Sequence, residues 1–214
     1  PPTASPPPTG AAPLHTGILA RMDSEAELAT LLGHEMTHAT HRHAIREQAS
    51  ASNWGAALAG LNVATLGLAT PLGALAAGAA VSGHGRDLER ESDRVGMELV
   101  AAAGYDVSDS PKLFQHLLEW VKEEKEEDDG SFFFSSHPRL EERLDSYRDL
   151  LAGPYRGRTG GVRNADAFRQ KTLKAVIANG RLEVAAGRFD AARRDAARVL
   201  AVDPKVGPAH AAPG

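Results

Sequence analysis

The chain has 214 residues, no cysteine, a net charge of −4 and a pI near 6.2. Without cysteine it cannot form disulfides, a cysteine zinc finger, an iron–sulfur cluster or a thiol nucleophile. The acidic balance and an aromatic content of only 5% argue against nucleic acid as a partner, so any chemistry falls to histidines, carboxylates and hydroxyls.

Two different segments open the chain. Residues 1–13 contain six prolines and no charge, which predicts an extended leader. A helix is predicted from Ser24 to Glu47, because Ser24 and Glu27 form a capping box and apolar residues follow at helical spacing. Gly33 is the one weak helix former in this stretch.

Residues 48–85 carry no formal charge, and about 20 apolar residues suffice to span a bilayer. The segment is mostly alanine and glycine, however, with asparagine, threonine and Pro71 interspersed. We therefore expect a close-packed helical hairpin broken near Pro71. A membrane span, or a surface that dips into the membrane, is the alternative that we do not favour.

Further helices are expected at about 86–103, 111–125 and 139–151, and a final pair of helices at about 165–202. The acidic run at 123–129 is expected to be a solvated helix end and loop. The predicted organisation is a leader (1–13), a mainly α domain with at most a small β-sheet (14–152), a linker (153–164) and a helical segment (165–214).

The motif H-E-x-x-H lies inside the first predicted helix, at His34, Glu35 and His38. A spacing of four residues places both imidazoles on one helix face, one turn apart, where they can share a zinc ion. Glu35 is adjacent to that face and can take a proton from the attacking water. The sequence therefore predicts one zinc ion per chain.

A catalytic zinc needs a third protein ligand and an open position. A third histidine at the spacing of the extended motif is missing, because Ala44 stands there. His41 and His43 are near in sequence, but we expect them at the surface or beside the ligands rather than on the metal.

A carboxylate from a later helix is the other source of a third ligand. Glu89 and Asp93 lie four residues apart on one helical face. Glu89 can bind the metal, while Asp93 can accept the outer N–H of a ligand histidine and fix its tautomer. On the residues alone Glu89 is only slightly favoured over Glu91, which we expect to be a solvated charge.

Three ordered segments, GHEMTHATHRHA, SGHGRDLERESDRVGMELVAAAGYD and SHPRLEER, resemble one family. They are similar to the zinc metallopeptidases of the CAAX-prenyl-endopeptidase and HtpX type, most of all to the soluble, periplasmic BepA-like branch. The family pattern is H-E-x-x-H, then E-x-x-x-D, then H-P with an arginine six residues after the histidine. The resemblance implies a zincin-like metallopeptidase fold and a location in the bacterial periplasm or cell envelope.

The resemblance also implies roles for individual residues. The implied zinc ligands are His34, His38 and Glu89, with Glu35 as general base and Asp93 as the partner of a ligand histidine. The later histidine and arginine of the family match His137 and Arg143. His137 is expected either to stabilise the oxyanion or to plug the metal as a self-inhibiting ligand, and Arg143 to support the oxyanion or its loop.

The sequence GRFDAA from Gly187, with Ala196, Leu200 and Asp203-Pro204, resembles the second half of a tetratricopeptide repeat. One such repeat buries too little surface to be stable alone. The alternative is an alanine-rich helical hairpin docked on the preceding domain. A repeat would provide a concave surface for a protein partner or substrate.

The predicted function is zinc-dependent endopeptidase activity on unfolded or misassembled polypeptides. The alternative is a catalytically silent or autoinhibited, chaperone-like module that binds proteins through the helical repeat.

Overall fold

The computed structural model describes residues 14–124, 139–158 and 160–206, and their regular structure is almost entirely helical. The helices are α1 (Thr16–Leu19), α2 (Glu25–Thr40), α3 (His43–Ala64), α4 (Thr70–Ala102), the short 3-10 helix η1 (Val107–Asp109), α5 (Ser110–Glu124), α7 (Leu140–Ala152), α8 (Ala165–Ala185) and α9 (Phe189–Val202). A single parallel bridge joins Tyr105 to Val162 within these described ranges. The predicted mainly α class is confirmed.

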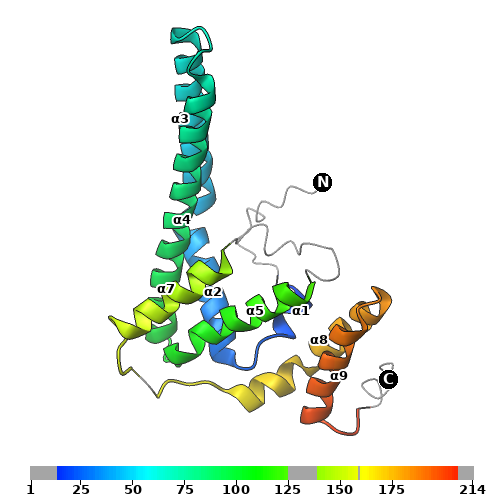
Figure 1. Cartoon of the computed structure of the whole chain (residues 1–214). Coiled ribbons are helices and arrows are strands. Elements are labelled where there is room, and N and C mark those ends of the chain that lie inside the picture. The colour runs from blue at the N-terminus through cyan, green and yellow to red at the C-terminus, as the bar shows by residue number, and fades with distance from the viewer. Residues whose placement is uncertain (1–13, 125–138, 159, 207–214) are drawn as a thin grey trace.

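The main core lies where α2 and the second half of α4 pack together, covered by α5 and α7 (Figure 1). Its fully buried large side chains include Met22, Met97, Leu113, Phe114, Leu117 and Tyr147. The rings of Phe114 and Tyr147 stack, with centroids 4.9 Å apart. This core holds α2 and α4 side by side.

Helix α2 begins as predicted but ends early. The hydroxyl of Ser24 accepts the amide N–H of Glu27 at 3.2 Å and donates to Asp109 at 2.8 Å. The helix stops at Thr40, so the prediction of one helix as far as Glu47 is wrong. Arg42 takes a left-handed conformation, with φ of 54°, and a new helix starts at His43. No glycine or proline marks this break in the sequence.

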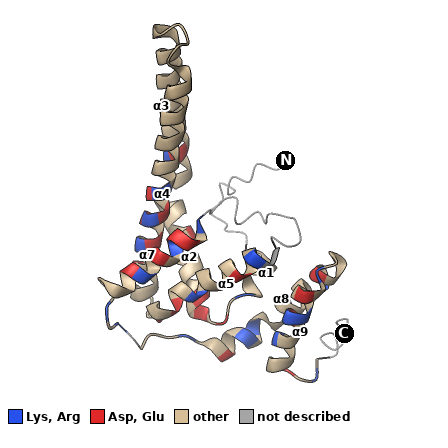
Figure 2. Cartoon of the chain, in the orientation of Figure 1, with Lys and Arg blue, Asp and Glu red and all other residues tan. Residues whose placement is uncertain are grey.

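Helices α3 and α4 form the predicted hairpin, which projects from the body of the molecule (Figure 1). The turn lies between Ala64 and Thr70, and Pro71 occupies the first turn of α4, where proline is tolerated. Figure 2 shows that the outer part of the hairpin carries no charged side chain. No residue from Ala44 to Asp87 is buried. None of the described helices is both long and apolar enough to cross a membrane.

The predicted C-terminal helix pair is present as α8 and α9. Val176 of α8 and Val199 of α9 share a small core with Ala20. Arg198 donates to the carbonyl of Met22 at 2.5 Å and pairs with Asp23 at 3.0 Å. The pair is thus docked on the segment that leads into α2, while its membership of the tetratricopeptide class stays a prediction.

Candidate metal centre

The helix that carries H-E-x-x-H and the helix that carries Glu89 cross at two glycines. A Cβ atom added to Gly33 would lie 2.8 Å from the carbonyl oxygen of Gly96, and one added to Gly96 would lie 2.9 Å from the amide nitrogen of His34. Such distances are too short for any side chain. The glycine that weakened the helix prediction is therefore the residue that lets α2 and α4 come into contact beside the site.

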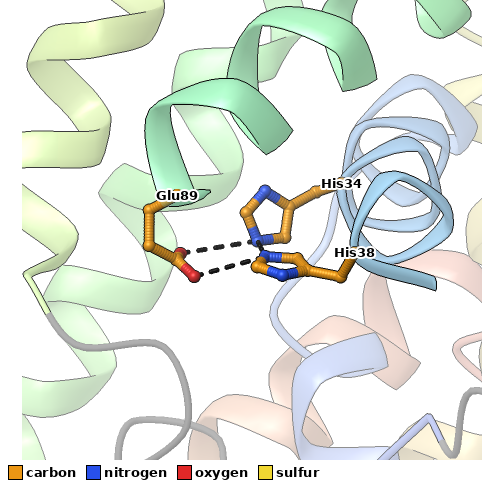
Figure 3. Close-up of side chains that lie close together, drawn as sticks. All are labelled: His34, His38 and Glu89. Carbon is orange, nitrogen blue, oxygen red and sulfur yellow. Dashed lines mark hydrogen bonds and ion pairs between the residues drawn. The ribbon is translucent and has the colours of Figure 1, made fainter. Parts of the chain in front are cut away.

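Three predicted ligands converge next to this crossing (Figure 3). The Nε2 atoms of His34 and His38 are 2.9 Å apart. One carboxylate oxygen of Glu89 lies 3.5 Å from His34 Nε2, and the other lies 3.2 Å from His38 Nε2. His34 is fully buried, whereas the side chains of His38 and Glu89 are about one-fifth exposed, at 20% and 17%.

This geometry suits zinc. Tetrahedral ligands at the usual Zn–N and Zn–O distances are separated from one another by roughly 3.3 Å. The three separations between these donor atoms run from 2.9 to 3.5 Å. Two imidazoles and one carboxylate are also a donor set typical of catalytic zinc.

The outer nitrogen of His34 faces a buried ion pair. His34 Nδ1 lies 3.2 Å from Asp93 Oδ1, which also accepts two N–H groups of Arg143 at 2.8 and 3.1 Å. Burial raises the pKa of Asp93, and the charge and hydrogen bonds of Arg143 oppose this rise. Burial also disfavours the charged guanidinium, yet the carboxylates of Asp93 and Glu89 outweigh it and raise the pKa of Arg143. Asp93 thus lies next to the outer nitrogen of His34, and Arg143 Nη2 lies closer still, at 2.7 Å. That Asp93 accepts an N–H of a ligand histidine stays a prediction.

The outer nitrogen of His38 faces another histidine. His38 Nδ1 lies 3.1 Å from Nδ1 of His43, the first residue of α3, and Ser92 Oγ lies 3.1 Å from that same His43 nitrogen. Burial, followed by the charge of His38, lowers the pKa of His43 to about 4, so its imidazole is neutral. The sequence predicted His43 at the surface or beside the ligands, and the structure places it beside His38. The contact itself and the role of Ser92 were not predicted, because a helix running on to Glu47 would turn His43 away from His38.

Glu91 also differs from the solvated charge that was expected. It accepts an N–H of Arg46 at 2.9 Å and lies 3.6 Å from His43 Nε2. The hydrogen bond from Arg46 lowers the pKa of Glu91. Glu91 therefore does not belong to the cluster of His34, His38 and Glu89. It lies on the far side of His43 from that cluster.

The remaining predicted residues are Glu35, Arg143 and His137. Glu35 lies on α2 beside the two histidines and is partly exposed. Arg143, on α7, is 3% exposed, and its Nη1 lies 3.6 Å from Glu89. His137 lies outside the described residues.

A family model and several known proteins match this chain. The model of peptidase family M48 matches residues 8–150, well over half of the chain. A putative beta-barrel assembly-enhancing protease of Vibrio cholerae is 34% identical over 148 residues, which are 64% of this chain and 30% of that protein. The beta-barrel assembly-enhancing protease of Escherichia coli K12 is 27% identical over 146 residues, 64% of this chain and 29% of the relative.

A eukaryotic protein also matches this chain. The mitochondrial metalloendopeptidase OMA1 of Arabidopsis thaliana is 30% identical over 159 residues, 68% of this chain and 31% of its own length. The chain thus spans about 30% of the length of these relatives. With its ordered motifs and its converging ligands, this chain belongs to peptidase family M48, a family of zinc metallopeptidases.

Proposed function

We propose that the protein is a zinc-dependent endopeptidase in which His34, His38 and Glu89 hold one zinc ion. The observation that carries this proposal is the convergence of these three donors, from two helices, within zinc-ligand distances of one another. Zinc bound there would polarise the scissile carbonyl and favour the ionisation of water.

Glu35 is the general base of this mechanism. Its carboxylate follows His34 directly on α2, on the partly exposed side of the helix. It takes a proton from the attacking water as the new C–O bond forms, and it delivers that proton to the leaving nitrogen as the C–N bond breaks. The same side chain therefore acts first as base and then as acid.

Arg143 and Asp93 act from behind the ligands. Arg143 is too deeply buried to contact a substrate. Its guanidinium donates to Asp93 and lies 2.7 Å from His34 Nδ1, so that Arg143 and Asp93 together orient the His34 ring. We assign Arg143 to organising the ligands rather than to the oxyanion. For His137 the two predicted roles, oxyanion stabilisation or a self-inhibiting plug on the metal, stay as proposals.

Unfolded or misassembled polypeptides are the proposed substrates. The words beta-barrel assembly-enhancing in the names of the bacterial relatives support this class and a location in the bacterial periplasm or cell envelope. The pair α8–α9 is the proposed partner-binding segment, because it stands as a separate helical hairpin docked through one edge on α1.

The test is hydrolysis of an unfolded protein by the zinc-loaded chain and by its Glu35→Gln variant. We expect cleavage by the parent that chelators abolish, and a loss of at least a hundredfold in kcat for Glu35→Gln with zinc still bound. Glu98→Gln, an exposed glutamate on α4 at 53% exposure, is the matched control and should retain activity.

Equal activity in the parent and in Glu35→Gln would contradict the assigned base. If neither the parent nor Glu35→Gln hydrolysed the substrate, the catalytically silent or autoinhibited alternative would be favoured. His137→Ala then separates these two cases, because only an autoinhibited enzyme gains activity from it.

A further inference from the structure

His43 occupies a place that the mechanism above does not use. It is 2% exposed, and its Nδ1 lies 3.1 Å from the Nδ1 of His38, with the two rings nearly perpendicular at 86°. The Nε2 of His38 faces His34 and Glu89. His43 therefore contacts the nitrogen of His38 that points away from the proposed metal.

We propose that His43 is a positioning residue for the proposed ligand His38, accepting its outer N–H and fixing its tautomer and ring orientation. This inference rests on the proposed zinc site. A histidine that binds a metal through Nε2 carries its proton on Nδ1, and that N–H needs an acceptor. The unprotonated Nδ1 of His43 is such an acceptor, so the proton of His43 lies on Nε2, the side of Glu91.

The backbone shows why His43 can reach this position. In an uninterrupted helix, residues five apart are rotated by about 140° and face different ways. The break after Thr40, with Arg42 in the left-handed conformation, turns the chain back so that His43 faces His38. A strained arginine at the break is the kind of backbone feature that clusters at functional sites.

Two side chains lie next to the His43 ring, although its Nε2 makes no hydrogen bond to any described residue. Ser92 is fully buried on α4, between Glu89 and Asp93, and its Oγ lies 3.1 Å from His43 Nδ1. Glu91 Oε2 lies 3.6 Å from His43 Nε2 and is itself held by Arg46 at 2.9 Å. Different groups thus lie at the outer nitrogens of the two proposed ligand histidines, Arg143 and Asp93 at His34 and an imidazole at His38.

A second metal site is the competing explanation for this cluster, because donor atoms of His41, His43 and Glu91 lie within 4.8 Å of one another. Two observations oppose it. The guanidinium of Arg46 already occupies the Glu91 carboxylate. A metal on His43 Nε2 would also need the proton on Nδ1, where His38 requires an acceptor.

The experiment measures zinc affinity by chelator competition and the visible spectrum of the cobalt(II)-substituted protein. We expect His43→Leu to weaken zinc binding 10- to 100-fold and to change the cobalt spectrum. His43→Asn, whose amide oxygen can take the place of Nδ1, should restore most of the affinity. His41→Ala, at a neighbouring residue with 39% side-chain exposure, is the matched control and should leave both readouts unchanged.

Three results would overturn the inference. The first is a His43→Leu variant with the zinc affinity and the cobalt spectrum of the wild type, and the second is an equal loss of zinc affinity in His43→Leu and His43→Asn. The third is a second zinc ion that binds the parent chain and no longer binds when His43 is replaced. If His43→Leu does not fold, His43→Met, which also lacks an acceptor at this place, gives the same test, with a similar loss of zinc affinity expected and an unchanged affinity contradicting the proposal. A parent chain that binds no zinc would instead refute the proposed function and the inference together.

Discussion

Arg143 shows how much a single buried charge can matter behind the site. It is 3% exposed, donates two hydrogen bonds to Asp93 and lies over the ring of Phe114, 4.4 Å from its centroid. Removing one partner of a buried ion pair leaves the other charge without compensation. We therefore expect the stability of the domain and the placement of His34, a proposed ligand, to depend on the same guanidinium.

We predict that Arg143→Met lowers the free energy of unfolding of the zinc-free protein by about 3–5 kcal/mol. Urea denaturation in the presence of a chelator measures this change. Arg94→Met is the control, because Arg94 is 56% exposed and pairs only at the surface with Glu98, so a change within about 1 kcal/mol is expected. A loss for Arg143→Met no larger than for the control would show that the buried pair contributes no net stability.

His116 gives a pH dependence away from the metal centre. Its Nδ1 lies 3.1 Å from Glu27, and this hydrogen bond is the main reason that the pKa of His116 is raised, with Asp23 and Glu119 adding to it. Because the folded pKa is higher than the unfolded value, the stabilisation is complete below about pH 6.5 and is lost as the pH rises through the folded pKa.

His116→Gln should therefore destabilise the protein at pH 5.5 by about 0.5–1 kcal/mol, and by less above pH 8, since a partly exposed pair is screened by solvent. Unfolding curves at both pH values in a chelator measure the difference. A cost that stays constant between them would mean that packing, rather than the charge of His116, is responsible.

At the scale of elements, the crossing of α2 and α4 decides whether the ligands meet. Gly96→Ala should push the helices apart, lower the free energy of unfolding by about 1–3 kcal/mol and weaken zinc binding, because the new methyl group meets the backbone of His34. Gly78→Ala in the same helix is the opposite control. Its Cβ would meet nothing within 4 Å, so it should stabilise by about 0.5–1 kcal/mol. If both variants changed the free energy of unfolding in the same direction, the close approach of α2 and α4 at Gly96 would not be the cause of the loss in Gly96→Ala.

The elements also show what the sequence can and cannot predict. The capping box at Ser24, the spacing of H-E-x-x-H and the spacing of Glu89 and Asp93 are local patterns, so the helices and the candidate ligands could be predicted from them. The break at Arg42 could not, because an arginine in the left-handed conformation depends on tertiary contacts. For the same reason the contact between His43 and His38 and the closeness of Gly33 to Gly96 became visible only in the folded chain.

At the scale of the whole molecule, the hairpin of α3 and α4 is separable from the core. Its outer part exposes several large apolar side chains, with Leu66 at 92%, Leu68 at 89% and Leu72 at 75% exposure. Replacing residues 51–81 by a short glycine–serine turn keeps Arg46, His43 and Glu91. We expect such a chain to unfold within about 1 kcal/mol of the parent, because surface residues away from the core contribute little.

Denaturation and zinc titration of the shortened chain, beside the full-length parent, check this expectation. A loss of several kcal/mol, or of zinc binding, would show that the outer hairpin supports the site from a distance.

The long helix α4 also affects how the molecule moves through water. Its 33 residues span about 50 Å, roughly half of it in the projecting hairpin. A rod attached to a compact body experiences more friction when it turns end over end than when it spins about its long axis. Rotational diffusion should therefore be anisotropic, and nitrogen-15 relaxation rates of amides along α4 should differ from those of helices that lie across it. Shortening the hairpin should remove most of this difference and reduce the Stokes radius more than the lost mass alone would.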